Sequence, residues 1–90
     1  MRVVVQPVPK SGPNGDRDTQ RHPYLDYRIH LCEEGAKPTK ETKVHEVSGF
    51  DHWWTCPRNR EDVAAEAMSF ARRLSRRMKT GGVIILKEKH

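Results

Sequence analysis

The chain has 90 residues, of which 34% are hydrophobic and 32% charged, and its formal net charge is +5. A chain of this length forms one domain with a thin core, because it buries only about 60–65% of its unfolded surface. A deep substrate cavity would be costly in such a core, so the composition argues against an enzyme with a small-molecule substrate.

The first half of the chain predicts strands joined by polar connections. Residues 2–8 are rich in valine and predict a strand that Pro7 and Pro9 close. Residues 9–23 hold three prolines and two glycines, which predicts a long flexible loop. Residues 33–42 form a polar turn. Residues 43–50 predict a weaker strand, with Val44 and Val47 on opposite faces and a bulge or bend at Gly49.

Residues 24–32 carry the clearest strand pattern, because polar and apolar side chains alternate with a period of two. The two predicted faces are Leu25, Tyr27, Ile29 and Leu31 on one side, and Asp26, Arg28, His30 and Cys32 on the other. This alternation predicts a half-buried strand with one face on the core.

One strong helix follows. Asn59 is a favourable N-cap, and Glu61 and Asp62 lie in the first turn, where the helix dipole favours acids. The apolar stripe of the predicted buried face consists of Val63, Ala67, Phe70, Ala71, Leu74 and Met78. Side chains spaced three and four residues apart share one helix face, so the helix is amphipathic.

The helix is predicted to end at Gly81-Gly82, and residues 83–86 to form a short final strand. The order β-β-β-α-β predicts a single α+β domain spanning residues 1–90. Its core is a three-stranded antiparallel sheet with the helix packed on it. The short C-terminal strand returns beside the first strand or at an edge.

Positive charge is concentrated near the C-terminus, where residues 71–90 contain seven Lys or Arg and one acid, Glu88. Arg72, Arg76 and Lys79 are predicted on the outer helix face. Arg73 and Arg77 form a second row nearer the apolar stripe. Such rows bind phosphates or acidic protein surfaces. Alternatively, they stabilise the helix C-terminus and cover apolar surface with their stems.

The segment FDHWWTCPRNR, residues 50–60, contains the adjacent Trp53 and Trp54. Neighbours on an extended segment face opposite sides, so one indole is predicted in the core. The other is then available to stack on a base or to anchor a protein partner. Which tryptophan is exposed stays open.

Two histidine–cysteine pairs are candidate zinc ligands: His30 with Cys32, and His52 with Cys56. His30 and Cys32 share one predicted strand face, and His52 and Cys56 are four residues apart. Neither pair has zinc-finger spacing, so we expect no metal and no cofactor. Neither has an oxyanion-hole glycine motif beside it, so we also expect no nucleophilic catalysis and no enzyme activity.

No stretch has the pattern of a signal peptide or the length of a transmembrane helix. We therefore expect a cytoplasmic protein without a membrane partner. In that compartment Cys32 and Cys56 would be thiols, whereas a disulfide would require an oxidising one.

Residues 62–86, DVAAEAMSFARRLSRRMKTGGVIIL, resemble the C-terminal half of some small phage-encoded anti-CRISPR proteins. The resemblance lies in an alanine-rich helix, a glycine turn and a V-I-I-L strand. At this level the arm-type DNA-binding domains of phage integrases look similar. The 9–23 loop and the Trp53-Trp54 pair depart from the anti-CRISPR pattern, so no site residues are carried over.

The resemblance implies a non-catalytic inhibitor that occupies a surface of a nucleic-acid-handling complex. Its partner would be a protein or a ribonucleoprotein complex. The alternative is a basic domain that binds DNA or RNA directly, and a third reading is a small zinc-stapled module.

Overall fold

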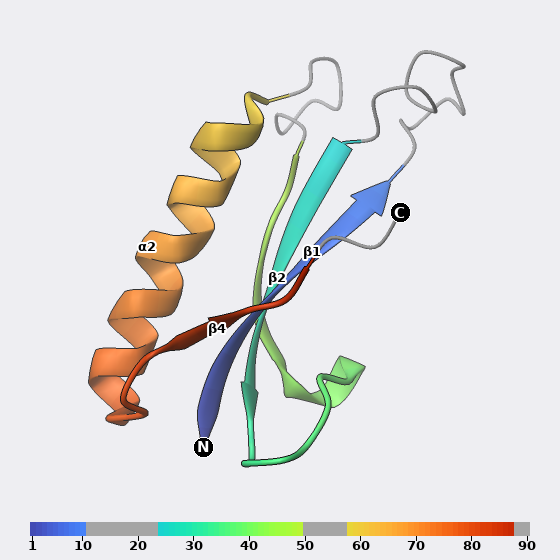
Figure 1. The fold of residues 1–90 in the computed structure, drawn as a ribbon. Helices are drawn as coiled ribbons and strands as arrows, with labels where there is room; N and C mark the ends of the chain where they lie inside the picture. The colour runs from blue at the N-terminus through green and yellow to red at the C-terminus, as the bar shows by residue number, and fades with distance from the viewer. Residues whose placement is uncertain (11–23, 50–57, 88–90) are drawn as a thin grey trace.

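Figure 1 shows the chain as a computed structural model, which describes residues 1–10, 24–49 and 58–87. The elements in chain order are β1 (Arg2–Lys10), β2 (Tyr24–Cys32), the short 3-10 helix η1 (Lys40–Thr42), β3 (Lys43–Val47), α2 (Arg60–Met78) and β4 (Val83–Ile85). The predicted α+β class and the predicted element order are confirmed.

The strands form one four-stranded sheet in the order β3-β2-β1-β4. The first three strands are antiparallel, as predicted, and β4 lies parallel to β1 at the edge, with Val3 opposite Val83. The sheet is therefore mixed. A parallel neighbour needs a crossover connection, and α2 supplies it by carrying the chain across one face from β3 to β4.

Strand β1 is longer than its sequence predicts, because Pro7 and Pro9 lie within it, opposite Tyr27 and Leu25 of β2. A proline fits a strand where its missing N–H is not needed. Strand β4 pairs with β1 only from Val3 to Val5, so both prolines come after that shared stretch. The predicted loop is thus shorter by two residues, and residues 11–23 lie outside the described part.

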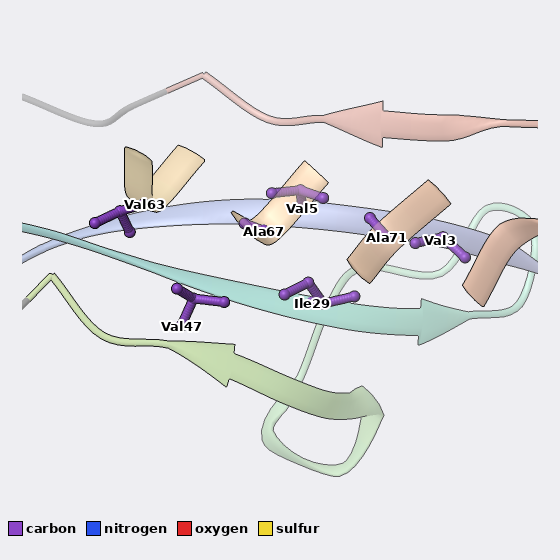
Figure 2. Packing of buried hydrophobic residues seen from close by; sticks show 7 residues of the cluster. All are labelled: Val3, Val5, Ile29, Val47, Val63, Ala67 and Ala71. Atoms are coloured by element: carbon purple, nitrogen blue, oxygen red, sulfur yellow. The ribbon is translucent and has the colours of Figure 1, made fainter. Parts of the chain in front are cut away.

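The core lies between α2 and the sheet, as Figure 2 shows. Its buried members are Val3, Val5, Ile29 and Val47 from the sheet, and Val63, Ala67 and Ala71 from α2. Phe70 and Leu74 are partly buried against them. Met78, predicted in the same stripe, is 42% exposed. The turn after α2 is bonded to Ser75, whose carbonyl accepts a hydrogen bond from the Thr80 amide at 3.1 Å.

The opposite face of the sheet is covered as well, which corrects the prediction of a half-buried β2. Asp26, His30 and Cys32 are each at most 2% exposed. The chain after β2 folds back over this face. There the Thr42 hydroxyl lies 3.0 Å from His30 Nδ1, and the Ala36 carbonyl accepts a hydrogen bond from the Arg2 guanidinium. We call Asp26, His30 and Cys32 the polar face. Arg28 alone behaves as predicted, half-exposed beside Glu46.

Strand β3 has Val44 exposed and Val47 buried, which agrees with their predicted opposite faces, but it ends at Val47, before the predicted end at residue 50. Gly49 forms a bend, and its amide donates to the Asp26 carboxylate at 2.8 Å. A Cβ at Gly49 would collide with the Leu25 carbonyl, so glycine is required by the close approach of two backbones. The irregularity of the β2–β3 ladder lies between Ile29 and His30.

Helix α2 begins as predicted, with the Asn59 side chain accepting from the amides of Glu61 and Asp62. Its end differs from the prediction. Lys79 adopts the left-handed cap conformation, with φ of 53°, which is uncommon for a residue with a side chain. Gly81 and Gly82 come later and form the turn into β4.

The small side chains under α2 generate a first prediction. Ala67 is fully buried, and replacing it with leucine would add three carbons to a packed interface. Ala67→Leu should therefore lower the free energy of unfolding by about 1–3 kcal/mol in urea denaturation. Ala65→Leu, at an exposed position of the same helix, is the matched control and should change it by less than about 0.5 kcal/mol. Equal effects of the two variants would contradict this packing.

A candidate anion-binding groove

One flank of α2 borders an open groove of about 1130 Å³. One part of its lining is small or apolar, from Ala64, Ala65 and Met68. Another part is basic, from Arg72, Arg76 and Lys79, and Gly82 of the turn and Val83 of β4 also line the groove. We call Arg72, Arg76 and Lys79 the basic row. The predicted outer row of basic residues thus borders the groove.

The basic row gathers because residues four and three apart share one helix face. All three side chains are exposed, and within the described ranges none of them forms an ion pair. The acids of α2 lie elsewhere, since Glu66 pairs with Arg58 at 2.8 Å near the start of the helix. Cations at the C-terminal end also complement the helix dipole. The groove therefore has an uncompensated positive side.

Arg73 and Arg77 form a second basic row on the other flank of α2. They border a smaller hollow of about 160 Å³ with Phe70 and Leu74, which confirms their predicted position near the apolar stripe. Phe70 stacks on His45 of β3, with ring centroids 4.0 Å apart and planes at 15°. The five predicted basic residues are thus split between two flanks, and only three border the groove.

Ser75 fixes the end of the groove. Its hydroxyl lies 2.6 Å from the Thr80 hydroxyl, donates to the Gly82 carbonyl at 3.0 Å, and accepts from the Gly82 amide at 3.1 Å. These bonds hold the turn against α2 and so position β4. Ser75 was not among the residues predicted from the sequence. Its position beside the apolar stripe, four residues after Ala71, could have indicated that it is buried.

His30 and Cys32, two of the four zinc candidates, lie on the polar face, across the sheet from α2. The His30 ring is engaged on both sides, with Nδ1 3.0 Å from the Thr42 hydroxyl and Nε2 3.1 Å from Gln6 Oε1. Cys32 is a buried free thiol. Across residues 1–10, 24–49 and 58–87, no three metal-binding side chains come together.

The other predicted site residues are Trp53, Trp54, His52 and Cys56, and all four lie outside the described residues. The predictions for them stay predictions. Helix α2, the long helix of the described part, is not apolar enough to cross a membrane.

The fold and groove define a small α+β protein with a four-stranded mixed sheet and one crossover helix. Comparisons with protein-family models, with curated proteins and with solved structures found no match to this chain.

The hydrogen bonds of Ser75 give a second prediction. Ser75→Ala should lower the free energy of unfolding by about 1–3 kcal/mol, because the Gly82 amide and the Thr80 hydroxyl lose a partner in a part-buried site. The control is Ser69→Ala, an exposed serine on the same helix, which should change it by less than about 0.5 kcal/mol. Thermal or urea unfolding measures both. A neutral Ser75→Ala would show that the turn is held by other contacts.

His30 gives a third prediction, on pH. Burial lowers its pKa below 6.5, and the positive charges of Arg28 and Lys43 lower it further, while a hydrogen bond to the backbone of Thr39 acts in the opposite sense. A lowered folded-state pKa means that the unfolded chain takes up the proton first. The stabilising contribution is therefore complete above about pH 6.5 and is lost as the pH falls below it.

Urea unfolding at several pH values between 7.5 and 5 measures this effect against His30→Gln, which cannot titrate. The wild type should lose stability faster on acidification than the variant, by at most about 1.4 kcal/mol per pH unit for one proton. Parallel pH profiles would show that His30 has the same pKa in both states.

Proposed function

We propose that the protein is a non-enzymatic binding protein that inhibits or modulates a nucleic-acid-handling complex by covering an anionic surface of its partner. The observation that carries the proposal is the groove, in which the basic row stands without acidic partners among the described residues. Unpaired cations beside a hollow attract a partner of opposite charge. The resemblance of residues 62–86 to anti-CRISPR proteins agrees with this function.

The chemistry of the groove supports binding over catalysis. Arginine is protonated at any physiological pH and does not act as a general base. His30 and Cys32, which the sequence offered as a possible base and nucleophile, are buried on the other side of the sheet. The groove offers positive charge and apolar contact, which are the properties of an interface.

The apolar part of the groove favours a protein partner. Arginine and methionine are enriched in protein–protein interfaces, and Met68 lies in the groove with Arg72 and Arg76. Phosphate contacts alone would make no use of the methionine and alanine side chains. A protein surface with carboxylates around an apolar centre would use both parts of the groove.

Direct binding of DNA or RNA is the second candidate, and the opposite flank of α2 supports it. There the second basic row lies near the stacked Phe70 and His45 rings. Proteins that bind single strands combine cations with aromatic rings in this way. The two candidates therefore use different flanks of one helix, which makes them separable by mutation.

A titration with two pairs of substitutions tests the proposal. The variants are Arg72→Ala with Arg76→Ala, and as a control with the same charge change, Arg73→Ala with Arg77→Ala. The probes are a fluorescein-labelled peptide of alternating Glu and Val, labelled duplex DNA and labelled single-stranded RNA. Fluorescence anisotropy at about 50 and 150 mM salt reports binding to each.

We expect the acidic peptide to bind, the Arg72/Arg76 variant to bind at least tenfold more weakly, and the Arg73/Arg77 variant to stay within threefold of the wild type. Nucleic-acid binding that falls steeply with salt and is lost in the Arg73/Arg77 variant would favour the second candidate instead. If the peptide does not bind at either salt concentration, the groove does not accept acidic partners and the proposal fails.

A further inference from the structure

Strand β4 ends the sheet, with β1 on one side and no paired strand on its other side among the described residues. The Leu86 amide donates to the Val5 carbonyl at 2.9 Å, on the β1 side. Backbone groups of successive residues in a strand point to alternate sides. The N–H and C=O of Ile85 therefore point to the outer edge, where they are available for pairing.

The two edges of the sheet differ in how they are protected. Edge strand β3 carries Lys43 and Glu46, which form an ion pair at 3.0 Å, and its ladder with β2 is irregular. Charges and bulges are the usual protection of an edge against unwanted strand pairing. Strand β4 has the sequence VII, without charge, proline or bulge. Its side chains Ile84 and Ile85 are 37% and 58% exposed.

An unprotected apolar edge is suited to strand addition, in which an extended segment of a partner pairs with it. The groove indicates what kind of segment. Val83 is both the first residue of β4 and part of the groove lining. A strand added about 4.8 Å outside β4 would present alternate side chains towards α2, on the flank that holds the basic row. Figure 1 shows α2 descending to the turn from which β4 returns.

We propose that β4 is a docking edge for an extended acidic segment of a protein partner, which adds as a fifth strand with its carboxylates towards Arg72, Arg76 and Lys79. The inference rests on the proposed function and specifies the form of the partner. Charge decides against a second copy as the occupant, because the chain carries a net charge of +5 and β4-to-β4 pairing would bring two basic rows together.

The experiment separates strand pairing from charge attraction. Ile85→Pro removes the outward N–H and leaves the hydrogen bond from Leu86 to Val5 in place. Ile85→Thr keeps the N–H and the β-branched shape, and is the matched control. The probe is the labelled peptide of alternating Glu and Val. A second peptide of the same sequence, N-methylated at every residue, keeps the charge but has no N–H with which to pair along either edge.

We expect Ile85→Pro to weaken peptide binding at least tenfold, Ile85→Thr to stay within threefold of the wild type, and the N-methylated peptide to bind the wild type at least tenfold more weakly. Hydrogen exchange of the Ile85 amide should slow when the unmodified peptide is bound. The peptide comparison and the exchange measurement use only the wild type, so they remain decisive if Ile85→Pro fails to fold.

If the N-methylated peptide binds as tightly as the unmodified one while Arg72→Ala with Arg76→Ala still abolishes binding, strand addition is wrong and the proposed function stands. If the arginine substitutions have no effect on binding, the proposed function fails, and the assigned orientation of the carboxylates fails with it. A wild-type dimer in sedimentation that Ile85→Pro dissociates would make a second copy the occupant and would overturn the inference.

Discussion

Helix α2 lies close to the sheet because the centre of its buried face consists of alanines. Ala67 and Ala71 are fully buried against Val3, Val5 and Ile29, so at this contact the helix contributes only methyl groups to the space between the two layers. A 90-residue chain has few large apolar residues, and close approach lets small ones exclude water effectively. The arginines and Met68 then emerge on the flanks of the helix. The groove is a consequence of this packing.

The same shortage of apolar residues explains the polar face. A thin protein cannot leave one side of its sheet wet without losing much of its buried surface. Here the chain after β2 covers that side, and two of its buried side chains are hydrogen-bonded within the protein. Asp26 accepts from the Gly49 amide, and the His30 ring lies within hydrogen-bond distance of Gln6 and Thr42. Hydrogen bonds replace part of the apolar packing, at the cost of sensitivity to protonation.

Local features were the most predictable from the sequence. The N-cap at Asn59, the bounds of β2 and the apolar stripe of α2 follow from capping chemistry and periodicity, which act over a few residues. The burial of the polar face was not predictable in this way. It depends on where residues 33–42 fold, and alternation in β2 says nothing about what covers its second face. Lys79 was missed because glycine is the common cap and the left-handed lysine is an exception.

For the site, the local spacing of side chains was predictable and their tertiary surroundings were not. Helical spacing identified the basic row and the second basic row, and the structure separates them as spacing implies. The groove itself was not predictable, because it needs the turn that Ser75 holds and the placement of β4 beside β1. The roles of Trp53 and Trp54 stay predictions.

The placement of β4 also bears on how the protein folds. Val3 pairs with Val83, so the final strand of the sheet joins residues that are eighty positions apart in the chain. Contacts of such long sequence separation are slow to form, because the chain must close a large loop before they stabilise anything. During synthesis, β1 therefore keeps one unpaired edge until residues 83–85 have emerged from the ribosome. A chain that lacks residues 83–85 would keep this edge of β1 without its β4 partner.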